Sequence, residues 1–456
     1  TASNNTAMGY GALGANTTGA DSVAVGKSSL AAQTTEGYNT AIGTEAGASN
    51  TSGSGLVAVG YQSADANTTG DKITAVGYQA LGGNTTGADN TALGYYALLA
   101  NTTGAENVAV GKGALDAATT AAGNTAVGTD ALGAVTTQGY NTAVGYNAML
   151  VATSAAGCSA FGNQALDANT TGDYNSAVGA AALGGNTTGA HNTALGYYAL
   201  LANTTASYGT ALGKNALAAN TTGTENTAVG AESLDANTTG GRNVALGTSS
   251  LGSNTTASNN TAVGHSALYA NTTGHSNTSI GYLAGYDITT ASNNLCLGKN
   301  AGRSSSPSGA LTTGSNTVVL GDDNIGALYC TQSSISTSDK RDKTDIENFN
   351  VGLSFINKMQ PVTYKWDKRS WYSDNLSVTP DGSKKGNKTQ VGFLAQDVEP
   401  LEKEIGFANN SDDMLFINLS EDNQRYGMQY ERLVTVLVNA VQELSAKVEE
   451  LEDKLK

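Results

Sequence analysis

A serine and a lysine that could together cut a peptide bond lie five residues apart, at Ser338 and Lys343. A serine hydroxyl is a poor nucleophile until a base takes its proton, and lysine can serve as that base where burial or neighbouring cations favour its neutral form. Lys340 and Arg341 are close enough in the sequence for their positive charges to disfavour the protonated form of Lys343. Taken alone, the spacing is a weak signal, and a solvated charged loop explains it better.

Three further blocks follow this pair in the chain, at residues 361–366, 391–398 and 430–433, and the last continues into a terminal helix. In order and spacing, the four blocks resemble the intramolecular chaperone of endosialidase family. Members of that family are auto-cleaving C-terminal domains of phage tailspikes, tail fibres and related surface proteins. The resemblance covers residues 338–456.

The resemblance implies a domain that trimerises, holds three upstream chains in register while a β-fibre forms, and then cuts itself off. The cut would fall between Thr337 and Ser338. Ser338 would be the nucleophile of this serine endopeptidase and Lys343 its base. Each domain would cut only once, because the reaction releases the domain from its own chain.

Supporting roles follow from the same resemblance. Asp339 would orient the loop, and backbone N–H groups or Arg341 would stabilise the oxyanion. Asp397 is a further candidate, and a helix-capping or structural carboxylate explains it equally well. No cofactor is predicted, and no metal site either, because His191, His265 and His275 occupy unrelated positions of the upstream sequence.

Upstream of this domain, a glycine recurs at every seventeenth position, from Gly9 and Gly26 to Gly298. Two residues before it, 16 of the 18 copies have Ala, and the residue directly before it is always apolar. Adjacent residues of a strand point to opposite faces. The face with Ala therefore has room for small side chains only, and the opposite face accepts larger apolar ones. Asn stands four residues before the glycine in 13 of the 18 copies. The pattern predicts two short strands per repeat, joined by Gly and Asn turns.

A repeat this short cannot bury its own apolar face, so neighbouring copies must stack. We therefore expect a mainly β chain whose residues 1–302 form a parallel β-roll or β-solenoid. Disorder of a chain rich in Gly, Ala, Thr and Asn is the alternative, but disorder has no reason to keep a fixed count. The repeats resemble the head repeats of trimeric autotransporter adhesins and the repeats of viral and phage fibres, which implies trimers.

After Gly298 the spacing breaks, and residues 303–337 are expected to form a last irregular repeat and a connector. Residues 338–456 then form a small α+β domain, with a coiled-coil helix over 430–456. Its seam alternates Val and Leu in steps of four and three: Val434, Leu437, Val441, Leu444, Val448 and Leu451. Val at one core position and Leu at the other slightly favour a two-stranded coiled coil, but the repeat array and the resemblance favour a three-stranded one. The alternative is a single amphipathic helix packed on its own domain.

Composition excludes several kinds of partner. The net charge of −15 disfavours nucleic acid, because phosphate binding needs clustered Lys and Arg. The sequence has no run of about 18 apolar residues, so no membrane insertion is predicted. Cys158, Cys296 and Cys330 lie far apart in the chain and are interpreted as small buried residues rather than as a disulfide frame or metal site.

The leading hypothesis is a homotrimeric viral or phage tail fibre in the virion. An upstream virion anchor and a host cell-surface receptor, with a glycan as one candidate, would be its partners. Tyrosines that follow the repeat glycine, such as Tyr61, Tyr78 and Tyr95, could stack on sugars or simply pack on the surface. An extracellular or cell-surface adhesin is the second hypothesis. A glycan-degrading tailspike is the third, although the array has no distinctive pair of carboxylates.

Overall fold

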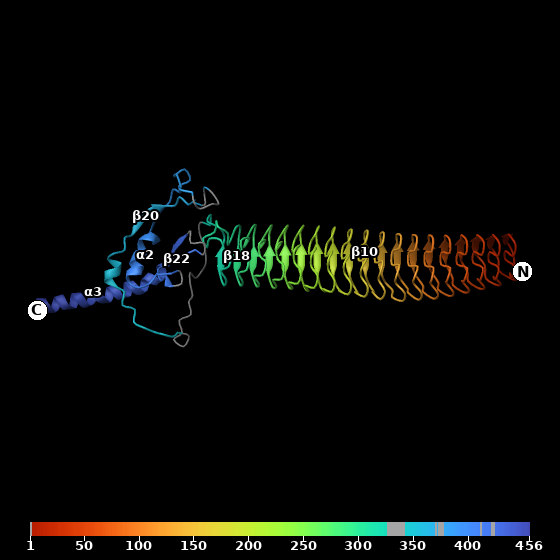
Figure 1. Ribbon diagram of the computed structural model, residues 1–456, viewed down its shortest axis with the longest axis horizontal. Coiled ribbons are helices and arrows are strands. Elements are labelled where there is room, and N and C mark those ends of the chain that lie inside the picture. The colour runs from red at the N-terminus through yellow and green to blue at the C-terminus, as the bar shows by residue number, and fades with distance from the viewer. Residues whose placement is uncertain (1, 326–342, 370–371, 373–377, 411–412, 421–424) are drawn as a thin grey trace. The chain divides into compact units, whose positions relative to one another are not determined.

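The computed structural model describes residues 2–325, 343–369, 372, 378–410, 413–420 and 425–456. The chain forms two compact units, Thr1–Tyr282 and Leu283–Lys456. The first unit is a stack of coils, each one repeat long (Figure 1). The second contains two further strands of the repeat type and a small domain of helices and two-stranded sheets.

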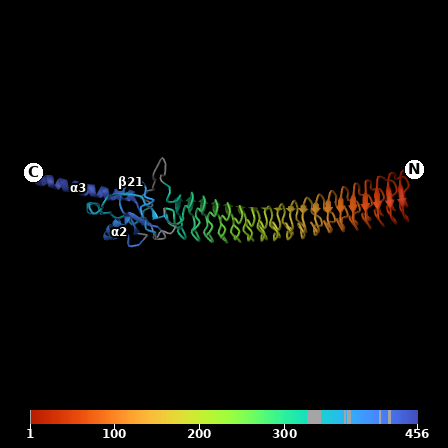
Figure 2. The ribbon, with the colours of Figure 1, turned by 90° about the horizontal axis from the view of Figure 1, so that it is seen from above.

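Each coil of the first unit contributes one short strand, and Figure 2 shows these coils stacked in chain order. Neighbouring strands pair in parallel, and each residue lies opposite its counterpart in the next repeat, so that Thr74 faces Thr91 and Ala75 faces Ala92. This confirms the parallel β-solenoid and its period. The strands are β1 (Thr6–Met8), β2 (Val23–Val25), β3 (Thr40–Ile42), β4 (Val57–Val59), β5 (Thr74–Val76), β6 (Thr91–Leu93), β7 (Val108–Val110), β8 (Thr125–Val127), β9 (Thr142–Val144), β10 (Ser159–Phe161), β11 (Ser176–Val178), β12 (Thr193–Leu195), β13 (Thr210–Leu212), β14 (Thr227–Val229), β15 (Val244–Leu246), β16 (Thr261–Val263) and β17 (Thr278–Ile280).

The two faces of these strands differ as the alternation predicts. From β2 onward the central Ala or Ser points inward and is buried, as at Ala92, where no surface is exposed. The residue before the repeat glycine points outward, and Leu93 keeps 46% of its surface exposed. The outward side chains form one continuous apolar stripe, here called the strand stripe, because every coil repeats the same register.

The expectation of two strands per coil is wrong. The second half of each coil is a chain of turns in which non-glycine residues take positive φ, such as Gln79 at 50° and Leu81 at 54°. Its backbone still bonds to the neighbouring coils, because Gln79 N–H donates to Tyr61 O and Leu81 N–H to Ala97 O, both at 2.9 Å. A left-handed residue costs about 1–2 kcal/mol. Complete burial of the Leu81 side chain, worth about 1.5–3 kcal/mol, offsets that cost.

The repeat glycine is required for two reasons at once. Gly60 has a φ of 133°, which side-chain-bearing residues rarely adopt. A Cβ at Gly60 would also press against the carbonyl group of Gly77 in the next coil. The glycine therefore sets how closely the coils approach each other.

Two columns of asparagine run through the interior. In one, Asn84 Nδ2 donates to Asn67 Oδ1 at 2.9 Å, and Asn101 Nδ2 donates to Asn84 Oδ1 at 2.7 Å. In the other, Asn107 Nδ2 donates at 2.8 Å to the Ala121 carbonyl, one coil further on. These side chains are fully buried, so the ladders satisfy polar groups that would otherwise be costly to bury.

The second unit begins with β18 (Leu295–Leu297) and β19 (Val318–Leu320), which pair in parallel with Leu295 opposite Val318. This interval is longer than one repeat, and the extra residues lie between the two strands. The remaining elements are α1 (Leu353–Ile356), β20 (Val362–Lys365), β21 (Thr389–Gly392), α2 (Ala395–Glu404), β22 (Ile417–Leu419), β23 (Tyr426–Met428), the 3-10 helix η4 (Tyr430–Arg432) and α3 (Leu433–Leu455).

The small domain has a conventional core in which Phe355, Phe416, Ile417 and Val436 are buried. Phe355 and Phe416 pack with ring centroids 5.2 Å apart. Strands β20 and β21 pair antiparallel, as do β22 and β23. This core fixes the base of α3 against the rest of the domain, because Leu433 and Val436 belong to both.

Candidate functional site

The proposed cutting site is described only at its downstream end. Thr337, Ser338, Asp339 and Arg341 lie outside the described residues. Lys343 is described and is exposed in the single chain. The Ser338–Lys343 pair therefore stays a prediction from the sequence.

The three downstream blocks lie side by side in the fold. The block at 361–366 supplies β20, which pairs with β21 so that Val362 lies opposite Gly392. The Tyr430 hydroxyl then accepts a hydrogen bond from Phe393 N–H at 3.2 Å, which ties the last block to the middle one. Burial, together with the neighbouring Tyr430, raises the pKa of Tyr364.

Asp397 lies in the first turn of α2 and is exposed. It is not the N-cap residue, which is Leu394. A carboxylate in this turn is favoured by the positive end of the helix dipole. The role of Asp397 in cutting stays a prediction.

Sequence reasoning missed a buried carboxylate, Glu402, in the last turns of α2. Its side chain has no exposed surface, and it accepts hydrogen bonds from the backbone N–H groups of Leu415, Phe416 and Ile417. The bonds from Phe416 and Ile417 measure 3.1 and 3.3 Å. Glu402 thereby fixes the start of β22 against α2. Nothing in its spacing distinguishes it from the exposed glutamates around it.

The segment that follows Lys343 is tied to α3. Asn439 Nδ2 donates to the carbonyl groups of Phe349 and Val351, at 2.5 and 3.1 Å. Glu443 Oε2 accepts from Leu353 N–H at 3.1 Å. These hydrogen bonds therefore connect the start of the domain to the base of the terminal helix.

The predicted seam on α3 is uncovered in the single chain. Leu433, Val436 and Ala440 face the domain core, whereas the seam residues lie on another side of the helix. Their exposed fractions run from 46% at Val448 to 62% at Val441. A groove lined by Val441, Leu444 and Val448 follows this side. The helix therefore does not bury its seam on its own domain.

Residues 338–407 match the family model described as chaperone of endosialidase. It is a peptidase family, and the match begins at the serine proposed as the nucleophile. The match supports an auto-cleaving chaperone domain at this end of the chain. It contains β20, β21 and α2, while α3 lies beyond it. No curated protein and no solved structure is significantly similar to the chain.

Among the described residues, no group of three or more His, Cys, Asp or Glu side chains is placed to hold a metal ion. No described helix is both long and apolar enough to cross a membrane. Cys158 and Cys296 are buried, as expected, and burial raises the pKa of Cys158 to about 11. Cys330 lies outside the described residues.

Proposed function

We propose that the chain is a homotrimeric fibre whose C-terminal domain aligns three chains and then cuts itself off before Ser338. The observation that carries the proposal is the match to the chaperone family at residues 338–407, directly downstream of a β-solenoid. The family match supports the chaperone part of the proposal, and the β-solenoid supports the fibre part.

Two uncovered apolar surfaces support assembly. One is the strand stripe, whose exposed members include Ile42, Leu93, Phe161, Leu195, Leu246 and Ile280. The other is the α3 seam, where Leu444 is 51% exposed. Burying such surfaces against copies of the same chain is favourable, and closed symmetry lets each copy bury the same patch.

The array itself explains why an aligning domain is needed. Its strand stripe repeats once in every coil, so a slip by one coil between two chains preserves nearly all contacts. A terminal domain that brings three chain ends level removes this ambiguity. Cutting then breaks the covalent link between the fibre and the domain that aligned it, so a fibre that has lost the domain cannot easily refold and is kinetically trapped.

Cutting is proposed to follow assembly. Lys343 is exposed in the single chain, so the enclosed surroundings that a catalytic lysine needs are proposed to come from assembly. Contact with neighbouring chains would change that environment. Arg341, Asp339 and Asp397 are proposed to support the reaction as the resemblance implies.

Attachment to a host cell-surface receptor, as part of a virion, completes the proposal. The surface tyrosines give a glycan limited support, because Tyr78 stacks between Tyr61 and Tyr95 with centroids 5.3 and 5.2 Å apart. Both faces of its ring are thus occupied, and edges and hydroxyl groups remain for a ligand.

Mass spectrometry of the purified chain tests the cut. The unaltered chain should yield one piece ending at Thr337 and one beginning at Ser338. Ser338→Ala should give an intact chain that still assembles, because one hydroxyl is lost and the seam is untouched. Lys343→Ala should also block cutting, and Lys358→Ala, on the same domain, should not. Normal cutting of Ser338→Ala would refute the nucleophile.

A further inference from the structure

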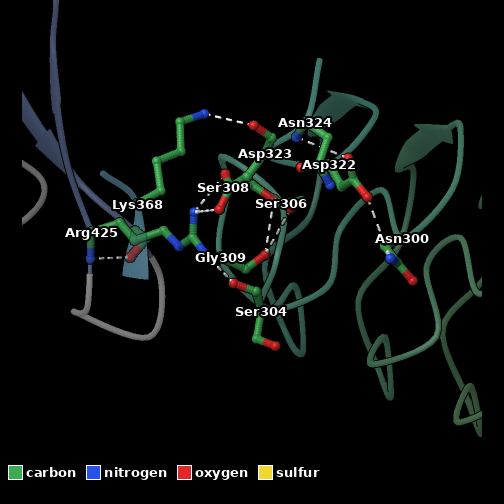
Figure 3. Close-up of polar contacts among 11 residues, drawn as sticks. Asn300, Ser304, Ser306, Ser308, Gly309, Asp322, Asp323, Asn324, Lys368 and Arg425 are labelled. Carbon is green, nitrogen blue, oxygen red and sulfur yellow. Dashed lines mark hydrogen bonds and ion pairs between the residues drawn. The ribbon is translucent and has the colours of Figure 1, made fainter. Parts of the chain in front are cut away.

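The closing coil of the second unit, residues 298–325, carries a buried acidic group at Asp323. Only 7% of this residue is exposed. Both carboxylate oxygens accept hydrogen bonds from Arg425 Nη1, at 2.7 and 2.6 Å. Figure 3 shows Arg425 and Lys368 converging on Asp323 from the chaperone domain.

The same two cations also bind backbone of the closing coil. Arg425 Nη2 donates to the Ser304 carbonyl at 2.5 Å, and Lys368 Nζ donates to the Asp323 carbonyl at 2.6 Å. The Arg425 side chain is 16% exposed, so this ion pair is screened far less than a surface pair. Charge-assisted bonds of this kind are about twice as strong as neutral ones.

The acceptors form a set only when the closing coil is folded. Ser304 and Asp323 are far apart in the sequence, and Asp323 N–H donates to Ser305 O at 2.9 Å to hold them together. The turn around Ser306 is itself fixed, because Ser306 N–H donates to Arg303 O at 2.8 Å. The residues inserted between β18 and β19 supply Ser304, which a coil of the ordinary repeat length would lack. Arg425 therefore recognises the folded closing coil rather than a linear segment.

The donors are equally well fixed on the chaperone side. Arg425 immediately precedes β23, and its N–H donates to Ser420 Oγ at 2.9 Å while Ser420 N–H donates back to Arg425 O at 2.8 Å. The β22–β23 pair thus holds the arginine by its backbone. Lys368 lies over the Trp366 ring, 5.2 Å from its centroid.

We infer that Asp323, Ser304, Arg425 and Lys368 form a docking clasp that holds the chaperone domain on the closing coil after the connecting peptide is cut. Every acceptor lies before residue 326 and every donor after residue 342. The proposed cut before Ser338 separates the two groups in the sequence without removing one of these contacts. The clasp's place in maturation rests on the proposed function, but its geometry does not.

An engineered cut tests the clasp independently of self-cutting. A full-length chain with Ser338→Ala would carry a site-specific protease sequence inserted between residues 326 and 337. After digestion, size-exclusion chromatography should find the two pieces together at low salt. With Arg425→Gln, the pieces should separate at least about tenfold faster, because the buried Asp323 loses its partner. Lys358→Gln removes a half-exposed ion pair with Glu404 on the same domain, and should change nothing.

A second variant guards against misfolding. Asp323→Asn removes the charge from the other side and keeps the size of the side chain, and it should also speed separation. Far-UV circular dichroism of each uncut variant reports whether it is folded. Pieces that separate at once without any clasp substitution, or pieces that stay together equally well in the folded Arg425→Gln and Asp323→Asn variants, would overturn the clasp. An unaltered chain that fails to cut itself would remove the proposed peptidase and leave this result standing.

Discussion

The array and the chaperone domain satisfy their buried polar groups in opposite ways. In the array, the Asn ladders repeat one contact from coil to coil, as from Asn67 to Asn84 to Asn101. In the chaperone domain, Glu402 binds three successive backbone N–H groups in an arrangement that occurs once in the described domain. Repeated contacts give stability that grows with length but no unique alignment between chains. Contacts that occur once are not repeated along the chain, so the alignment of chains proposed for the smaller region would not be open to the same slip.

A charge in the α3 seam should have the largest effect. Leu444→Asp places a carboxylate where chains would pack, so assembly should fail and the chain should stay uncut. Ala446→Asp, on the opposite side of the helix, is the matched control and should assemble. Light scattering gives the mass and gel electrophoresis the cutting. Assembly of the Leu444→Asp chain at the mass of the unaltered one would show that the seam does not align the chains.

A glycine substitution should break the array locally while the chaperone domain stays intact. Gly145 has a φ of 143°, and a Cβ there would meet the Gly162 carbonyl. Gly145→Ala should cost about 2–4 kcal/mol and expose the neighbouring coils to hydrogen exchange. Gly133→Ala is the control, because its Cβ would find its nearest neighbours at 3.4 Å and its φ is not positive. Equal exchange in both variants would mean that the repeat glycine does not set the coil spacing.

The sequence predicted the array better than the domain for a physical reason. A fixed period exposes every structural requirement many times, so the inward Ala92 and outward Leu93 could be assigned from columns of residues. The turns in the second half of each coil were not predicted. Leu81 has a positive φ there, and leucine normally avoids positive φ, so its presence gave no sign of a turn. Glu402 and Arg425 each make their contacts once, with partners distant in the sequence. Neither lies in a repeated sequence pattern from which those contacts could be predicted. Ser338 was recognised only by resemblance.

Interrupting an Asn ladder should have a smaller effect than changing the glycine. Asn84→Ala removes the donor to Asn67 and the acceptor for Asn101, leaving buried groups unpaired at a cost of about 1–3 kcal/mol. The chain already contains one such end, since Asn101 Oδ1 finds no donor in the described part of the chain and the next coil has Ala118 at that place. Hydrogen exchange of the flanking coils measures the effect. Thr86→Ala, at an exposed position in the same coil, is the control and should leave exchange unchanged.

Acid should affect the two regions in opposite directions, and this is the smallest expected effect. In the array, burial raises the pKa of Asp65, Asp116, Asp167 and Asp235 above the ordinary 3.8. The folded array therefore holds protons more tightly than the unfolded chain, and it should gain stability as the pH falls through the raised values towards 3.8.

In the chaperone domain, hydrogen bonds from Lys403 and Tyr426 lower the pKa of Glu399 below 4.5. The stability that Glu399 provides is complete above pH 4.5 and is lost as the pH falls through its lowered value.

Thermal unfolding at pH 6 and pH 4 separates the regions, because both tryptophans lie in the domain and their fluorescence reports on it alone. The fluorescence transition should move down, and the array's circular dichroism transition should move up. Asp65→Asn should reduce the upward shift and Glu399→Gln the downward one. Movement of both transitions in the same direction would show that these carboxyl groups do not set the response of either region.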